Sequence, residues 1–373
     1  MLASLILLVQ HNALGQNITQ ELPDHSSSDY SNAQGQPTYP LDSNTALDTI
    51  PSNDNLGIVL PGGYIERMDN YLIGQISFVN DNERFSVDQG TQEYQIYPNG
   101  LSKLKFHLNY RFLSLGFNVI PKFISSNDDD RLKGKTHGIG FSTSLNFANW
   151  VQSFSYSNIH GFYLDNTKDF QPDWQEGDPY VQFPDLVYRN YQGMTGYSFN
   201  PNFSTKALLT GTERQLKSAG TFLPSLLYRY YTVDNRAEVT ASSSTQKSNN
   251  FEILASAGYY YTYVIKEDFY LSAGGSAGYG LLSAKITTRR IADRIVTKQN
   301  NGIFRYDLRA AAGYNSERIF AGFVFTTENS QYKQANTSVI NANWRVITQF
   351  SLAYRFNAPA QLRDNLNRII PGG

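Results

Sequence analysis

The sequence predicts an all-β fold, an antiparallel up-and-down transmembrane β-barrel of about 12 strands, with 10–14 strands possible. Charged residues make up only 17% of the 373-residue chain, while 14% are aromatic. Soluble domains usually carry about 25% charged residues, so this surface is poor in charge. From about Tyr64 to Phe356 the hydrophobic pattern repeats every two residues. Several alternating runs exceed the roughly five or six residues of an average globular strand.

The chain begins with features of an exported protein. An apolar run from Leu2 to Val9 is followed by Ala13-Leu14-Gly15, the small-residue spacing that signal peptidase reads. We therefore expect a signal peptide over 1–15, with a buried strand as the alternative. Residues 16–63 are mostly polar and lack a hydrophobic period, which predicts a disordered periplasmic leader before a barrel over 64–356.

The strand assignment follows the alternation of apolar and polar residues. It is clearest over 104–112, 251–263 and 304–314, where the polar face contains Arg, Lys, Gly and Ser, as a wet lumen would. Tyrosines gather near the strand ends, where rings sit between lipid and water. The expected strands are 70–80, 85–97, 103–118, 136–147, 150–162, 203–213, 221–233, 250–264, 268–283, 301–314, 318–328 and 339–356.

Loop lengths predict the topology, because outer-membrane barrels have short periplasmic turns and long outer loops. The short connections are expected at 148–149, 216–220, 265–267 and 315–318, and the outer loops at 119–135, 163–202, 234–249, 284–300 and 329–338. The last strand, Trp344 to Phe356, ends on Phe and resembles the signal that barrel-assembly machinery recognises. A tail over 357–373 follows and is expected in the periplasm. The predicted location is the bacterial outer membrane, with membrane lipid and the assembly machinery as partners.

A series of short motifs adds a family resemblance. The motifs are Tyr97-Pro98-Asn99 with Tyr110, Gly134-Lys135-Thr136 before Trp150, Gly161-Phe162-Tyr163-Leu164, Gly196-Tyr197 before Phe199-Asn200 and Phe203-Ser204, and the run from Arg214 to Gly220. In this order they resemble a Bacteroidota family, the domain of unknown function DUF4421. The resemblance covers most of the mature chain. It implies an outer-membrane barrel of unassigned activity and defines no catalytic residues.

The predicted outer loop 163–202 is the most unusual segment, because a loop of this length is uncommon unless it is functional. Aromatic side chains alternate in it with acidic residues, namely Asp165, Asp169, Asp173, Glu176, Asp178 and Asp185. The polar strand faces supply the expected lumen-lining residues Lys105, His107, Arg111, Arg229, Glu252, Arg305, Asp307, Arg309 and Arg355. An acidic loop over a basic lumen could plug the barrel or select solutes by charge. Alternatively, the lumen arginines pair with acids and only hold the barrel together.

Three further motifs were considered for other chemistry. His107 has no serine that spacing alone pairs with it, although a Ser–His nucleophile depends on geometry rather than spacing. Gly134-Lys135-Thr136 lacks the earlier glycine of a phosphate-binding loop, and Asp128 to Asp130 reads as a solvated acidic turn or a Ca²⁺ loop. The sequence has no cysteine and a net charge of −1, so no thiol chemistry and no nucleic-acid partner are expected. No metal site, cofactor or catalytic residue is assigned.

The sequence therefore predicts an outer-membrane barrel that acts as a channel or transport-related pore. Three alternatives remain open: an outer-membrane enzyme acting on lipid or peptide, a structural or surface-binding barrel, and a secreted soluble β-protein.

Overall fold

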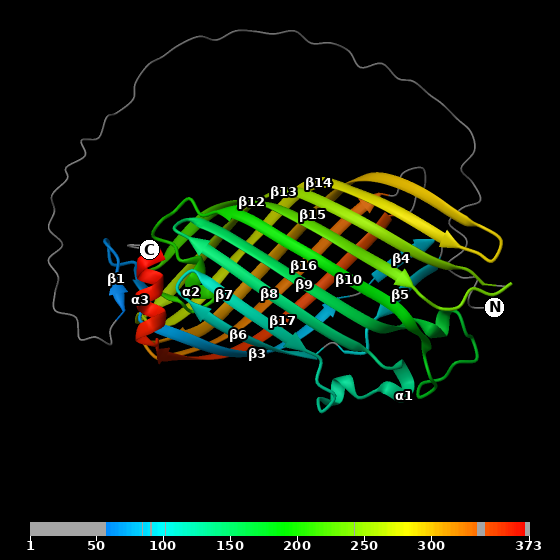
Figure 1. Ribbon diagram of the computed structural model, residues 1–373, viewed down its shortest axis with the longest axis horizontal. Helices are drawn as coiled ribbons and strands as arrows, with labels where there is room; N and C mark the ends of the chain where they lie inside the picture. The colour runs from blue at the N-terminus through cyan, green and yellow to red at the C-terminus, as the bar shows by residue number, and fades with distance from the viewer. Residues whose placement is uncertain are drawn as a thin grey trace, which may run out of the picture.

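The computed structural model describes residues 57–369, apart from 84, 90–91, 101, 242 and 334–339. Twelve of the described strands pair in one antiparallel ring (Figure 1). In chain order they are β3 (Tyr71–Glu83), β6 (Ser102–Tyr110), β7 (Leu113–Val119), β8 (His137–Phe147), β9 (Trp150–Leu164), β10 (Val181–Tyr197), β12 (Ala219–Asn235), β13 (Thr245–Ile265), β14 (Phe269–Arg289), β15 (Arg294–Asn315), β16 (Ile319–Lys333) and β17 (Ile340–Asn357). Strands that follow one another in the ring pair with each other, including β10 with both β9 and β12, and the ring is closed by the pairing of the last strand, β17, with the first, β3.

The remaining elements are short and lie at the two ends of the ring. A small sheet joins β1 (Ile58–Val59), β2 (Ile65–Arg67) and β11 (Glu213–Gln215). A hairpin pairs β4 (Phe85–Gln89) with β5 (Gln92–Tyr97), and β5 is joined to ring strand β9 by the pairs Ile96–Leu164 and Tyr97–Tyr163. The helices are η3 (Ser125–Asn127), α1 (Asp130–Lys133), η4 (Thr167–Asp169), α2 (Thr205–Leu209) and α3 (Ala360–Ile369).

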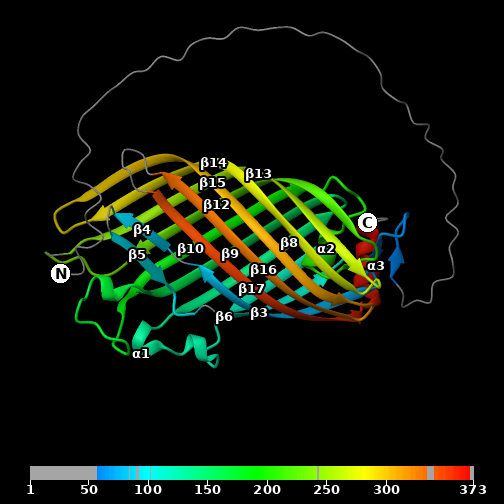
Figure 2. The same ribbon diagram turned by 180° about the vertical axis from the view of Figure 1, so that it is seen from behind.

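The barrel has two different ends. At the end we term proximal, β3 begins, β17 ends, and the strands are joined by the tight connections 111–112, 148–149, 266–268 and 316–318. Segment 198–218, which contains α2 and β11, also lies at this end (Figures 1 and 2). At the opposite, distal end lie the connections 120–136, 165–180, 236–244 and 290–293. The predicted alternation of short turns with longer loops is therefore present.

Alternate residues of each strand face opposite sides of the wall, as the period of two predicts. On β13 the exposed positions are the apolar Phe251, Ile253, Tyr259, Tyr261 and Tyr263, while Glu252 and Leu254 between them are buried. The same contrast recurs on β17, where Phe350 is 55% exposed and the neighbouring Ser351 is 2% exposed. The described residues contain no helix long and apolar enough to cross a membrane.

A charge placed on this outward face tests whether it contacts lipid. Leu308 of β15 is 56% exposed and lies midway along the apolar part of its strand. We expect Leu308→Arg to lower the stability of the refolded barrel in bilayers by about 2–4 kcal/mol, as cations do near the bilayer midplane. Val296→Arg, at an exposed position nearer the distal end of the same strand, should cost about 0–1 kcal/mol. Equal effects in urea titrations of the two variants would contradict a lipid-facing belt.

The predicted fold class is confirmed, but three of the twelve expected strands were wrong. Residues 85–97 form the hairpin β4–β5, which is not a ring strand, and 103–118 divide into β6 and β7 at the turn Arg111-Phe112. Arg111 has φ 50° there, a left-handed turn that no Gly, Asn or Pro announces. Residues 203–213 contain α2 and part of β11, because Ser204 caps a helix by accepting a hydrogen bond from the Ala207 N–H.

The missing strand is β10, inside the predicted outer loop 163–202. Its register shifts between Phe183 and Val187, which leaves Pro184 and Asp185 in an irregularity of the ladder. Proline is tolerated at such a place because its ladder hydrogen bond is already lost. The outer loop is consequently limited to 165–180. The predicted loop 284–300 was also wrong in extent, since β14 and β15 continue to a turn at 290–293.

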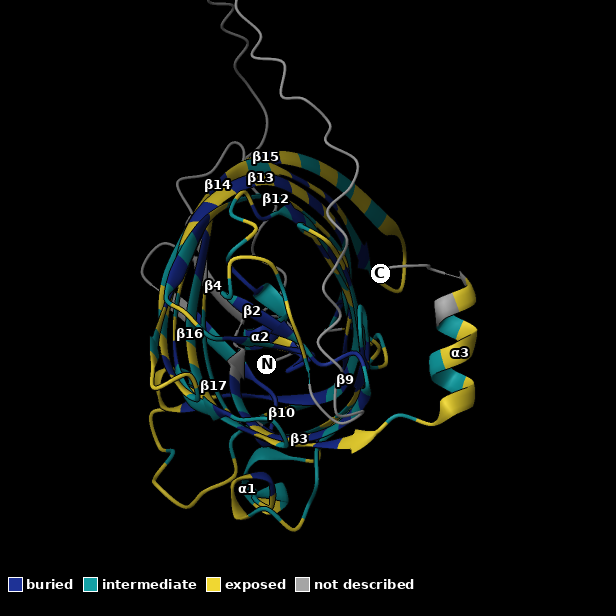
Figure 3. Ribbon diagram, turned by 90° about the vertical axis from the view of Figure 1, so that its left-hand side faces the viewer, coloured by how far each residue is buried: buried dark blue, intermediate teal, exposed yellow. Residues whose placement is uncertain are grey.

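The predicted terminal segments are only partly covered. The signal peptide 1–15 and most of the leader 16–63 lie outside the described residues. Within that leader, Ile58 and Val59 form β1 and pair with β2. Part of the tail 357–373 forms α3, which lies outside the outline of the ring when the barrel is viewed along its axis (Figure 3).

Candidate functional site

Two segments far apart in the sequence meet at the proximal end of the ring, where β1 projects beyond the strand ends (Figure 1). Residues 57–70, with β1 and β2, lie against segment 198–218, with α2 and β11. We term these two segments together the plug. Viewed along the axis, β2 and α2 lie within the outline of the ring (Figure 3). Inside the plug, Glu213 binds both Ser204 and Lys206, and the Gln215 amide donates to three backbone carbonyls.

An apolar contact places α2 inside the wall. Leu208 of α2 packs against a cluster of Ile73, Tyr270, Ala311, Phe320 and Ala353, which are inward residues of five neighbouring strands. These side chains are between 0% and 8% exposed. Since apolar burial stabilises the folded state, this contact holds α2 against the barrel.

Polar contacts join the plug to the wall around it. The fully buried Arg355 donates to the Gly211 carbonyl and to the side chain of Asn315, 2.7 Å away, and also to the Ser316 carbonyl. Arg214 bridges Glu66 of the plug and Asp268 of a proximal turn, at 2.5 and 2.6 Å. Together with the bond from Arg214 Nε to the Asn315 carbonyl at 2.9 Å, these contacts give each nitrogen of both guanidinium groups an acceptor. The plug is therefore a folded part of the barrel.

A chain of alternating charges crosses the inner wall between β6 and β15. Lys103 and Arg345 both bind Asp81, at 2.8 and 2.7 Å. Glu328 then lies 2.7 Å from Arg305 and 3.8 Å from Arg345. These ion pairs connect the strands that bring the first and last parts of the barrel sequence into contact. They use one predicted lumen residue, Arg305, and four that the sequence analysis did not single out.

A second buried pair joins β12 and β13. Arg229 donates two hydrogen bonds to Glu252, at 2.9 and 2.7 Å, and its guanidinium lies 4.4 Å from the centre of the Tyr231 ring. Asp307 instead accepts hydrogen bonds from Ser276 and from Tyr260, the latter at 3.4 Å. The Arg229–Glu252 and Ser276–Asp307 contacts link adjacent strands, and the Tyr260–Asp307 contact reaches across β14 from β13 to β15. Such contacts have the structural role considered as the alternative to a charge-selective lumen.

Three further predicted lumen residues, Lys105, Arg309 and Arg111, are not part of the charge pairs described above. Lys105 and Arg309 lie at inward positions on β6 and β15, and neither has an ion pair among the described residues. Arg111 lies in the proximal turn, where its Nε donates to the Asp69 carbonyl of the plug at 3.4 Å.

His107 has a serine beside it that the sequence could not identify. The His107 Nε2 atom lies 3.5 Å from the Ser142 hydroxyl, and Gly116 lies between these residues in the register. The other ring nitrogen, Nδ1, is buried and has no partner. A catalytic Ser–His pair needs a group that orients the imidazole through this nitrogen, and the described residues supply none. Gly116 has a steric role, since a Cβ there would lie 2.4 Å from both side chains.

The predicted acidic residues of 163–202 lie around the distal rim. Asp169 accepts from Asn166, and Asp178 accepts from the backbone of Gln175. The Tyr180 ring contacts Tyr163 edge-on and Trp174 at a tilt, and its backbone N–H donates to the Leu132 carbonyl of α1. No ion pair in the described part of the chain joins Asp165, Asp169, Asp173, Glu176, Asp178 or Asp185 to a lumen cation. The proximal plug, which the sequence analysis missed, occupies the lumen instead.

Two of the three acids in the Asp128–Asp130 turn form ion pairs. Asp129 pairs with Lys133 and Asp130 with Lys122, at 2.9 and 2.6 Å. Within the described ranges no group of three or more His, Cys, Asp or Glu is arranged to hold a metal ion.

Solved structures with a related arrangement are outer-membrane proteins. The outer membrane protease OmpT of Escherichia coli is 11% identical, with 78% of this chain and 98% of that chain covered and a TM-score of 0.33. For OmpT of Vibrio cholerae the identity is 7%, the coverages 76% and 96%, and the TM-score 0.29. The toluene transporter TodX of Pseudomonas putida is 7% identical, with 78% of this chain and 90% of that chain covered and a TM-score of 0.27. Likenesses this distant say nothing about what the chain binds or does.

No curated protein matches the sequence. The family resemblance is confirmed, because residues 54–356 match the model of the family described as "Domain of unknown function (DUF4421)". The chain belongs to this family.

Proposed function

We propose that this protein is a gated conduit of the bacterial outer membrane, closed at its periplasmic end by the plug and selective for small anions when open. The observation that carries the proposal is the folded plug inside the proximal end of the ring. The exposed apolar outer face supports a membrane location, because a closed barrel leaves no strand edge and can bury this face in lipid. Short turns at the proximal end support a periplasmic position for that end.

The inner face of β8 and β9 supports a polar route through the barrel. Its side chains are small and only half-buried: Ser142, Ser144, Ser153, Ser155 and Ser157. The opposite part of the wall carries more cations than acids at inward positions, since Lys105 and Arg309 add to the paired charges described above. A lumen with excess positive charge favours anions.

Removing the plug tests this function. We expect no steady conductance from the wild-type barrel in planar bilayers, and open channels when residues 203–216 are replaced by a four-residue Gly-Ser linker and the chain is started at residue 70. In a KCl gradient the open variant should prefer Cl⁻ over K⁺, and the additional substitution Arg309→Gln should weaken this preference.

The matched control shortens the distal loop. Residues 168–178 lie outside the ring strands, so replacing them with a Gly-Ser linker removes Asp169, Asp173, Glu176 and Asp178 without removing a strand. The conduit proposal expects this control to stay closed. Channels that appear only in the loop variant would support the acidic loop as the barrier, and a plug-free barrel that folds but never conducts would contradict the conduit.

A further inference from the structure

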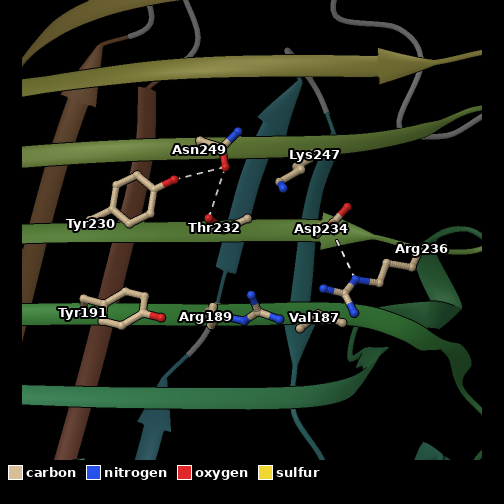
Figure 4. A pocket seen from close by; sticks show the side chains of 9 residues that line it. All are labelled: Val187, Arg189, Tyr191, Tyr230, Thr232, Asp234, Arg236, Lys247 and Asn249. Atoms are coloured by element: carbon tan, nitrogen blue, oxygen red, sulfur yellow. Dashed lines mark hydrogen bonds and ion pairs between the residues drawn. The ribbon is translucent and has the colours of Figure 1, made fainter.

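A polar hollow lies on the outside of the barrel wall, near the distal ends of β10, β12 and β13 (Figure 4). Its volume is about 170 Å³. Side chains of Arg189, Arg236 and Lys247 reach it from three different parts of the chain, and Thr232 and Asn249 form its floor. The register places these groups side by side, because Arg189 pairs with Thr232 and Asp234 with Lys247.

The hollow faces away from the lumen. On β12, Arg229 and Tyr231 point inward, so the alternating residues Tyr230 and Thr232 point outward. On β10, Tyr188 belongs to an inward apolar cluster, which places Arg189 on the outside. The cations are therefore separated from the lumen charges by the thickness of the wall.

The hollow directly borders the apolar belt. Tyr191 and Tyr230 pair across β10 and β12, are 40% and 43% exposed, and line its proximal side. Tyrosines at such positions mark the boundary between hydrocarbon and headgroups. Arg189 and Thr232 are the next outward residues toward the distal end. They consequently lie at the depth where lipid phosphates are found.

Positive charge in the hollow exceeds the acid available to it. Asp234 is the acid that lines it, and it already binds Arg289 at 2.5 Å and Arg236 at 3.3 Å. Arg189 and Lys247 have no ion pair in the described part of the chain. The same surface continues around the wall, since Asn249 pairs with Lys285 and Lys285 with Lys298, and both lysines are exposed.

We propose that this hollow binds a phosphate group of a glycolipid in the surrounding leaflet, with Arg189, Arg236 and Lys247 as the phosphate ligands. Arginine and lysine donate charge-assisted hydrogen bonds to phosphate oxygens. The Asn249 amide nitrogen adds a neutral donor, because the Thr232 and Tyr230 hydroxyls already donate to the Asn249 side-chain oxygen. A soluble anion could meet the same cations, but the bordering tyrosines and the exposed apolar belt provide a surface for acyl chains that only a lipid would use. The inference rests on the membrane location proposed above and is independent of conduction.

The test uses the full-length protein in detergent micelles and native mass spectrometry. The probes are diphosphorylated lipid A and the same lipid A with its phosphates removed. We expect the wild type to bind the phosphorylated probe at least about tenfold more tightly. The triple substitution Arg189→Gln, Arg236→Gln and Lys247→Gln should abolish this difference while leaving binding of the dephosphorylated probe unchanged.

The control variant removes the same three charges elsewhere, by Lys266→Gln, Arg290→Gln and Arg368→Gln, which are exposed and outside the hollow. It should bind both probes as the wild type does. Equal binding of both probes by the wild type would overturn the proposal, whether or not the triple variant folds. Loss of phosphate preference in the control would overturn it as well, and so would displacement of phosphorylated lipid A by inorganic phosphate at equal concentration.

Discussion

Replacing Glu252 by alanine is expected to lower the free energy of unfolding of the barrel by about 3–5 kcal/mol, the usual cost of leaving a buried partner charge unpaired. Glu252 is 1% exposed and accepts both hydrogen bonds that Arg229 donates to a carboxylate. Without it, the guanidinium keeps the Tyr231 ring beside it but loses its counter-charge. Urea titration of the refolded protein in lipid bilayers measures the change.

The pair itself should contribute much less than either single substitution suggests. The double variant Arg229→Met with Glu252→Leu removes both charges and fills similar volume, so we expect it to recover most of the stability lost in Glu252→Ala. Glu238→Ala, in an exposed distal position, should change stability by less than about 0.5 kcal/mol. A double variant as unstable as the single one would show that the charges themselves stabilise the wall.

The barrel could be predicted because its signal is repeated in nearly every strand. Apolar residues such as Phe251, Tyr259 and Tyr261 recur on one face, and the inward residues between them are polar or small. The strand number also agreed, but partly through errors that offset one another. The segments 85–97 and 203–213 are not ring strands, while the division of 103–118 and the strand β10 supply the two that were missing.

The errors have a common physical cause, which is that local patterns do not reveal pairing. Pro184 and Asp185 made β10 resemble a loop, although a register shift accommodates both residues. The turn at Arg111 contains no typical turn residue, so β6 and β7 were read as one strand. Ser204 is a typical N-cap residue and could have indicated a helix, but the alternating pattern of 203–213 favoured a strand.

The sequence could predict which residues face the lumen, but not which of them contact one another. Alternation indicated that Arg229, Glu252 and Arg305 share the inner face, but which charge meets which depends on the register between strands. Asp81 and Arg345 are separated by most of the barrel sequence and meet because β3 pairs with β17. His107 and Ser142 are likewise neighbours only through β7 between them.

The plug could not be predicted from the sequence, because its contacts also depend on pairing between distant segments. Substitution of Arg355 is the best test of how the plug is attached. This residue lies on the last strand, yet its donors reach Gly211 in the plug and both Asn315 and Ser316 at the turn between β15 and β16. Arg355→Met leaves these acceptors buried without a donor, so we expect about 3 kcal/mol less stability. Arg355→Lys should recover only part of it, because one ammonium cannot reproduce the planar fork.

We expect the loss of the Arg355 contacts to loosen the plug, because these contacts hold the plug and not the outer face of the barrel. In Arg355→Met we expect faster cleavage by trypsin at Lys206, Arg214 and Lys217, together with brief channel openings that the wild type lacks. Arg363→Met, on α3 outside the ring, removes the same charge near the same end and should show neither change. The contrary outcome is that Arg355→Met unfolds at a lower urea concentration while its plug resists trypsin as well as in the wild type. The plug would then be held by the apolar contact through Leu208, and the polar contacts of Arg355 would not be what keeps the barrel closed.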